Sequence, residues 1–243
     1  MKYTILFCFA TLTFFSCCKK PKPGNFKVQL QTSVGAQPFL VSTPYADGMG
    51  KDFYFNKLKF YLSHVKLIKT DNSEVEIKDA AFFNTDDNNW KSFTAEVDAG
   101  TYKGIKFSVG LDPAQNATDP DNFSADEALG PKDDMYWEWQ KHRFIVAEGV
   151  ADTTGNNFLG GNHGLGYHVG TDATYRTATV TGVDIVVEGG VEKQITLQLD
   201  LLKVFYGTTD TVNMFTESAT QSEAGDLPLA IKFADQFSKA FSY

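Results

Sequence analysis

Alternating apolar and polar positions predict β-strands along most of the chain. Residues 26–31 alternate with a period of two, which is typical of a strand with one buried face. Residues 53–69 form a longer run rich in aromatic and β-branched side chains, and we expect one long bent strand or two consecutive strands there. Residues 71–73 predict a turn, after which residues 74–77 pair back onto the long run.

Two further strand pairs are expected later in the chain. Residues 93–97 and 104–111 are separated by a short turn and resemble a hairpin unit. Residues 178–188 and 191–202 are joined by Gly189-Gly190, a dipeptide typical of tight hairpins. Residues 112–131 predict a long polar loop, and long ordered loops in compact domains are often functional.

The C-terminal tail changes its period. Between residues 222 and 241 the apolar positions begin with strand-like spacing and end with helical spacing, which predicts a short terminal helix. A hydrophobic content of 42% in 243 residues is enough for one core, and no repeat or linker divides the chain after the N-terminal segment. The predicted fold is therefore all-β: a single antiparallel β-sandwich over residues 26–243, with long loops and the short helix.

The N-terminus is predicted to be an export signal rather than part of the fold. Lys2 precedes the apolar residues 5–15, and Ser16 is followed by Cys17, in the pattern of a bacterial lipoprotein signal peptide over residues 1–17. Cys18 competes with Cys17 as the lipidated residue, and an ordinary signal peptide is the alternative. Residues 18–25, rich in Lys and Pro, are expected to be an extended tether. The domain would then be lipid-anchored in the cell envelope, on the periplasmic or outer-membrane face.

Charge and motifs exclude several function classes. The net charge of −8 argues against a nucleic-acid or anionic-membrane surface, so the membrane contact would be the lipid anchor alone. No nucleotide-binding or nucleophile motif is present, and we expect a protein that is not an enzyme. Acidic pairs occur in three loops, at residues 86–87, 119–121 and 133–134, without the spacing of a calcium loop or a defined glycosidase pair.

One window concentrates the scarce residues. Residues 133–170 hold two of the three tryptophans and three of the four histidines: Trp137, Trp139, His142, His163 and His168. Imidazole is a common ligand of copper and zinc, so the window indicates either a metal site or a packed aromatic corner. Trp137 and Trp139 are two residues apart and would share one face of a strand. His64, in the long aromatic run, is a further candidate.

Several motifs resemble those of MbnP-like proteins, the methanobactin-associated, periplasmic copper-binding family related to MopE- and CorA-type copper proteins. The motifs are FYLSHVKL at 60–67, GTY at 100–102 with IKFSVG at 105–110, MYWEW at 135–139, and HVG at 168–170. The resemblance implies a β-sandwich that binds copper through histidines. In relatives, a tryptophan is oxidised to kynurenine by a partner di-haem, peroxidase-like maturation enzyme and helps form the site.

Carried onto this chain, the motifs nominate His168 as a copper ligand and Trp137 or Trp139 as the covering or oxidised residue. His64 and His142 are additional candidate ligands, although both depart from the family pattern: His64 stands where many relatives have Asn, and His142 where Gly-Tyr is common. The resulting hypothesis is an exported, lipid-anchored copper-binding protein for acquisition, storage or transfer of the metal. The alternative is a structural or ligand-binding envelope lipoprotein without a metal.

Overall fold

The computed structural model describes residues 22–47, 51–155, 158, 162–207 and 210–243. The predicted signal peptide, Cys17 and most of the tether lie outside these residues. The first strand, β1 (Gly24–Val34), begins two residues earlier than the predicted domain start. In the described part of the chain, no helix is both long enough and apolar enough to span a membrane.

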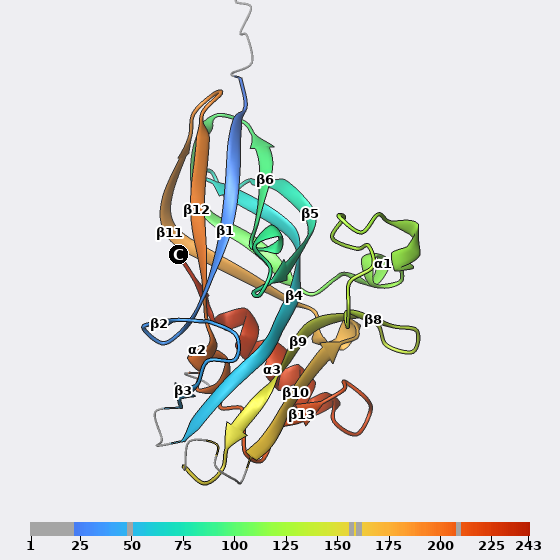
Figure 1. Cartoon of the computed structure of the whole chain (residues 1–243). Helices are drawn as coiled ribbons and strands as arrows, with labels where there is room; N and C mark the ends of the chain where they lie inside the picture. The colour runs from blue at the N-terminus through green and yellow to red at the C-terminus, as the bar shows by residue number, and fades with distance from the viewer. Residues whose placement is uncertain (1–21, 48–50, 156–157, 159–161, 208–209) are drawn as a thin grey trace, which may run out of the picture.

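A nine-stranded sheet forms the larger layer. Its main path runs β11-β7-β4-β9-β10-β13, with β5 and β3 on β4 and β8 on β9. The strand bounds are β3 (Tyr45–Ala46), β4 (Asp52–Lys69), β5 (Glu74–Asn84), β7 (Gly100–Val109), β8 (Tyr136–Trp137), β9 (Lys141–Asp152), β10 (Asn162–Gly170), β11 (Arg176–Val187) and β13 (Ala219–Thr220). The long aromatic run is thus one continuous strand, β4, which Figure 1 shows crossing the whole molecule.

A five-stranded sheet covers the upper half of this layer in Figure 1. Its strands are β1, β2 (Gln37–Pro38), β6 (Ser92–Val97), β12 (Glu192–Asp200) and β14 (Phe241–Ser242). Buried apolar positions of both sheets form one continuous core between them. The β-sandwich is confirmed. Both sheets are mixed, because β1 pairs with β12 and β10 with β13 in parallel.

The predicted hairpins over residues 93–111 and 178–202 are both wrong. β6 pairs with β1 in the smaller sheet, whereas β7 pairs with β4 and β11 in the larger one. Likewise, β12 pairs with β1, although only the turn at Gly189-Gly190 separates it from β11. These short turns connect the two layers of the sandwich. Hydrophobic period and turn residues predict where the chain reverses, but the strand with which each segment pairs can be distant in the sequence.

Helices replace the smaller sheet over the lower half. α2 (Leu201–Phe205) and α3 (Leu227–Lys239) pack beside β9 and β10, and the predicted C-terminal helix is confirmed as α3. Its buried residues recur with helical spacing, and Phe233 stacks on Tyr167 of β10 at 4.5 Å between ring centres. This contact holds the inner face of β10 against the core, so alternate residues of β10 point away from it.

The predicted long loop lies on the opposite, outer face. It contains α1 (Pro113–Asn116) and the single 3-10 turn η2 (Pro120–Asn122), and it leads into β8. Two other 3-10 turns, η1 (Asn88–Trp90) and η3 (Asp172–Thr174), complete the elements. Trp137 lies in β8, which pairs with β9, and Trp139 lies in the turn that joins these two strands.

Candidate metal centres

Strand register assembles the first site on the outer face. His168 of β10 lies opposite Val146 of β9, which lies opposite Lys59 of β4. In the adjacent row Lys57 of β4 lies opposite Glu148 of β9. Directly opposed residues of antiparallel strands point to the same face, and diagonal neighbours come within reach of long side chains. The register therefore brings His168, Glu148 and Lys57 together.

Both ring nitrogens of His168 meet an oxygen. Nε2 is 2.8 Å from Glu148 Oε1, and Nδ1 is 2.9 Å from Oε1 of Gln221, which follows β13. The His168 carbonyl accepts hydrogen bonds from the amide of Gln140 and the hydroxyl of Ser222. With a side chain only 12% exposed, His168 is held in place from both its backbone and its ring.

The protonation of the ring sets what this arrangement can do. A neutral imidazole carries one proton, which can lie on either ring nitrogen. On Nε2 the proton donates to Glu148, and on Nδ1 it donates to Gln221 and leaves the Nε2 lone pair facing the Glu148 carboxylate. In this second tautomer an imidazole nitrogen and a carboxylate oxygen 2.8 Å apart form a donor pair that a metal cation can bind.

Glu148 is kept ionised by its neighbours. Its second oxygen lies 2.9 Å from Lys57 Nζ, and the same ammonium group contacts Asp134. Burial by itself would raise the pKa of Glu148, but hydrogen bonds from Lys57 and His168 bring the pKa below its usual range. Glu148 therefore supplies a full negative charge beside His168 at neutral pH.

Two tryptophans cover this cluster. The Trp137 ring stands edge-on to His168, with 5.6 Å between ring centres, and Trp139 lies 5.3 Å from Trp137. Trp139 is 58% exposed, so it forms the outer layer. Behind Trp137, the guanidinium carbon of the buried Arg143 lies 3.6 Å from the ring centre, a cation–π contact. The two rings are in contact, but Trp139 lies in the turn after β8, so the predicted shared face of one strand is not formed.

An open acidic groove adjoins the tryptophans. It has a volume of about 680 Å³ and is lined by Trp137, Trp139, Asp119, Asp121, Asp133, Glu138 and four further residues. Lys132 also lines the groove, and four carboxylates against this one ammonium group produce a negative potential that attracts cations. The indole rings that cover His168 form part of its lining.

His142 lies in a different environment. Its ring is fully buried, with edge-on contacts to Tyr61 and Tyr136, and its Nε2 is 3.3 Å from the Thr118 hydroxyl. Burial lowers the pKa of His142 to about 4, so the ring is neutral at pH 7. His142 is a core residue enclosed by the long loop, and this placement separates it from the Glu148 cluster.

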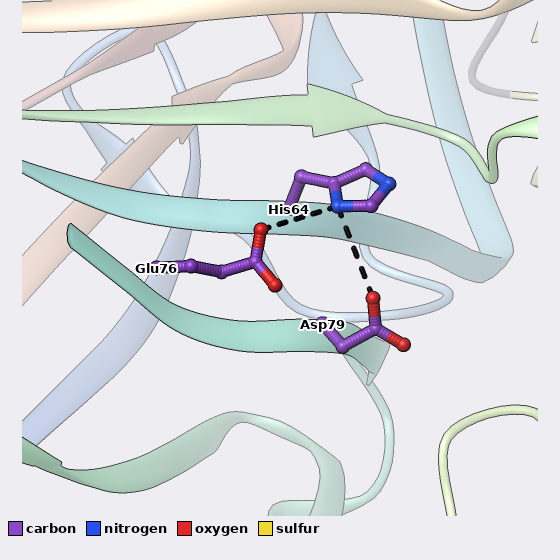
Figure 2. Close-up of side chains that lie close together, drawn as sticks. All are labelled: His64, Glu76 and Asp79. Atoms are coloured by element: carbon purple, nitrogen blue, oxygen red, sulfur yellow. Dashed lines mark hydrogen bonds and ion pairs between the residues drawn. The ribbon is translucent and has the colours of Figure 1, made fainter. Parts of the chain in front are cut away.

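His64 forms a third environment, at a β-bulge of β4. The register with β7 passes from Ser63–Ser108 to Lys66–Lys106, so β4 carries an extra residue, and His64 has φ of 47°, in the left-handed region. Its Nδ1 lies 3.3 Å from Glu76 and 3.8 Å from Asp79, both on β5, as Figure 2 shows. Its Nε2 lies 2.7 Å from Asp112.

The three candidate histidines are therefore not brought together. No hydrogen bond or ring contact within the described residues joins any two of them. Of the acidic loops, Asp87 and Asp119 accept hydrogen bonds that begin 3-10 turns, and Asp134 pairs with Lys57. These carboxylates have structural partners rather than the arrangement of a hydrolase pair.

Sequence reasoning missed the oxygen donors. Glu148 had a detectable signal, because it is the lone charge within the apolar run of residues 144–151. Glu76 and Asp79 lie on the outer positions of β5, where acidic residues are ordinary. Gln221 is 53 positions from His168, and nothing local marks it.

Comparison with known proteins agrees with the fold. The family model described as MbnP matches residues 23–223. Among solved structures, MbnP from Methylosinus trichosporium is similar, with a TM-score of 0.51, 16% sequence identity, and coverage of 84% of this chain and 82% of that chain. No curated protein matches the sequence. The predicted resemblance is confirmed by the family match, and at 16% identity the solved structure supports the fold alone.

Proposed function

The chain belongs to the MbnP family, and from this premise we propose that it binds a copper ion at the cluster of His168 and Glu148. The observation that most directly supports this proposal is the distance of 2.8 Å between His168 Nε2 and the Glu148 carboxylate, with Nδ1 directed at Gln221. Imidazole and carboxylate suit Cu(II), and the family relationship selects copper among the cations that these donors accept.

The surrounding residues support binding in defined ways. Gln221 orients the imidazole, as hydrogen-bond partners of metal-binding histidines generally do. Lys57 pairs with the second oxygen of Glu148 and leaves the first directed at His168. Trp137 limits access of water to the cluster, and the acidic groove beside it draws cations toward the cover.

Trp137 is the better candidate for the oxidised tryptophan implied by the family. Its ring edge faces His168, whereas Trp139 lies outside it and is 58% exposed. Oxidation of Trp137 would place new polar atoms next to the imidazole. A di-haem maturation enzyme would meet the exposed Trp139 first, 5.3 Å from Trp137.

The broader role follows from the N-terminal sequence. A lipid on Cys17 would hold the domain at the cell envelope, where it would acquire, store or transfer copper. We propose a binding role rather than an enzymatic one, since holding a metal requires no catalytic base. The metal-free alternative is supported by one observation: contacts with Glu148 and Gln221 already occupy both ring nitrogens of His168.

The test is metal analysis and intact-mass measurement of the mature protein purified from its native envelope without chelators. We expect one copper per chain, lost in His168→Gln, and a mass gain on the peptide that holds Trp137. Copper without a mass gain would support the copper site and contradict the oxidation of Trp137. If native protein carries no copper and neither Cu(I) nor Cu(II) binds on titration, the metal-free alternative holds.

A further inference from the structure

We propose a second, separate cation site in which His64, Glu76 and Asp79 bind a borderline divalent cation of the zinc class (Figure 2). One ligand atom from each residue lies within 4.8 Å of the other two. Along β4, His64 is five residues from Lys59, the residue in the row of His168, which corresponds to roughly 16 Å of strand. The two histidines cannot share one ion.

The spacing of the donors fits a tetrahedral ion. Zinc binds imidazole nitrogen and carboxylate oxygen at roughly 2.0–2.2 Å, so two ligands in a tetrahedral site lie about 3.4 Å apart. The observed separations from His64 Nδ1 are 3.3 Å to Glu76 Oε2 and 3.8 Å to Asp79 Oδ1. These values lie on either side of the tetrahedral separation, and small side-chain rotations would bring all three atoms onto one ion.

Asp112 orients the imidazole for this role. It lies 2.7 Å from His64 Nε2, so a proton on Nε2 leaves the Nδ1 lone pair directed at Glu76 and Asp79. A carboxylate on the far nitrogen of a ligating histidine is the usual arrangement in zinc proteins. Asp112 is itself held, because its other oxygen accepts the backbone N–H of Gln115 at the start of α1.

The same residues hold Asp79. The Gln115 amide donates to Asp79 Oδ1 at 2.9 Å and to the Asp79 carbonyl at 3.2 Å. A carboxylate oxygen has two lone pairs, so Oδ1 can accept this bond and still bind a cation. Asp112 and Gln115 thus link both sides of the cluster, His64 and Asp79, before any ion binds.

Charge and access also favour a cation. Three carboxylates surround one imidazole, and the nearby ammonium groups of Lys66 and Lys106 pair with Glu74 instead. The Glu76 and Asp79 side chains are 43% and 68% exposed, so an ion can enter and keep water as a further ligand. Imidazole is a poor ligand for calcium and magnesium and a good one for zinc, which sets the class of ion.

The experiment is zinc titration of the metal-free mature protein in the His168→Gln background, which removes the proposed copper ligand. We expect one bound Zn²⁺ per chain, with at least tenfold weaker binding in Glu76→Gln and in Asp79→Asn. Glu96→Gln is the matched control, because it removes the same charge from an exposed strand position outside the cluster. It should leave the affinity unchanged.

Two further measurements separate ligation from a general charge effect. Asp112→Asn keeps a good helix cap but removes the orienting charge, and we expect about tenfold weaker zinc binding with an unchanged unfolding midpoint. Co²⁺, used as a spectroscopic probe, should give the intense visible absorption of a tetrahedral site. No zinc binding in the His168→Gln protein, or equal losses in Glu96→Gln and Glu76→Gln, would overturn the second site and leave the copper proposal untouched.

Discussion

His168 and His142 are carried by neighbouring strands of one sheet, yet the structure gives them opposite roles. His168 meets a carboxylate oxygen and an amide oxygen under a tryptophan cover, so both of its ring nitrogens have polar partners. His142 is enclosed by the rings of Tyr61 and Tyr136, so its surroundings exclude charge. The difference shows that an imidazole acquires its chemistry from the partners on adjacent elements and not from its place in a motif.

The largest effect is expected from a substitution of His142, which should lower the stability of the fold without changing copper binding. His142→Ala would leave a cavity between Tyr61 and Tyr136, and we expect a loss of about 3 kcal/mol in the free energy of unfolding. Copper per folded chain should stay the same. Urea denaturation and metal analysis of the refolded fraction measure the two quantities. A His142→Ala variant that is stable but carries no copper would contradict the assignment of His142 to the core.

The second prediction concerns pH. The pKa of His142 is about 4 in the folded protein and about 6.5 in the unfolded chain, so the unfolded state binds more protons between these values. The stability that this residue contributes is complete above pH 6.5 and is lost as the pH falls toward 4, by about 3 kcal/mol. Urea denaturation from pH 7 to 4 should show this dependence in the wild type and lose it in His142→Gln.

A third effect, slightly smaller, is expected at His168. His168→Gln removes the imidazole nitrogen that faces Glu148, and copper affinity should fall by at least about 100-fold, or 2.7 kcal/mol. The free energy of unfolding should change by only about 1 kcal/mol, because Glu148 keeps its contact with Lys57. Competition with a chromophoric copper chelator measures the affinity. Equal affinity in variant and wild type would place the copper elsewhere.

The smallest effects distinguish the two tryptophans. Trp137→Phe weakens the contact with Arg143 and the cover over His168, so we expect a stability loss of about 1 kcal/mol and several-fold faster copper release. Trp139→Phe changes an exposed ring and should alter stability by less than about 0.5 kcal/mol. Stopped-flow copper removal by a chelator compares the two. A larger effect at Trp139 would contradict the layered cover.

Part of the candidate site could be predicted from the sequence. His168, Trp137 and Trp139 were identified because scarce residues gather in one window and match family motifs, and the structure places their rings in contact. Their grouping with His64 and His142 could not be tested from the sequence. A bulge that adds one residue to β4 changes the direction of the His64 side chain. Histidine seldom adopts a φ of 47°, so the residue type at this position gives no sign of the bulge.

Several strands and the terminal helix could be predicted from the sequence, because burial of one face imposes a period of two or 3.6 on nearby residues. The sequence left open whether residues 53–69 form one strand or two, and the structure has the single strand β4 there. Packing of the whole chain places β6 and β7 in different sheets and Gln221 beside a histidine 53 positions away. Periodicity is a local property of the chain. Strand partners, the faces of strands and sets of ligands depend on the packing of the whole core, which brings together residues that are far apart in the sequence.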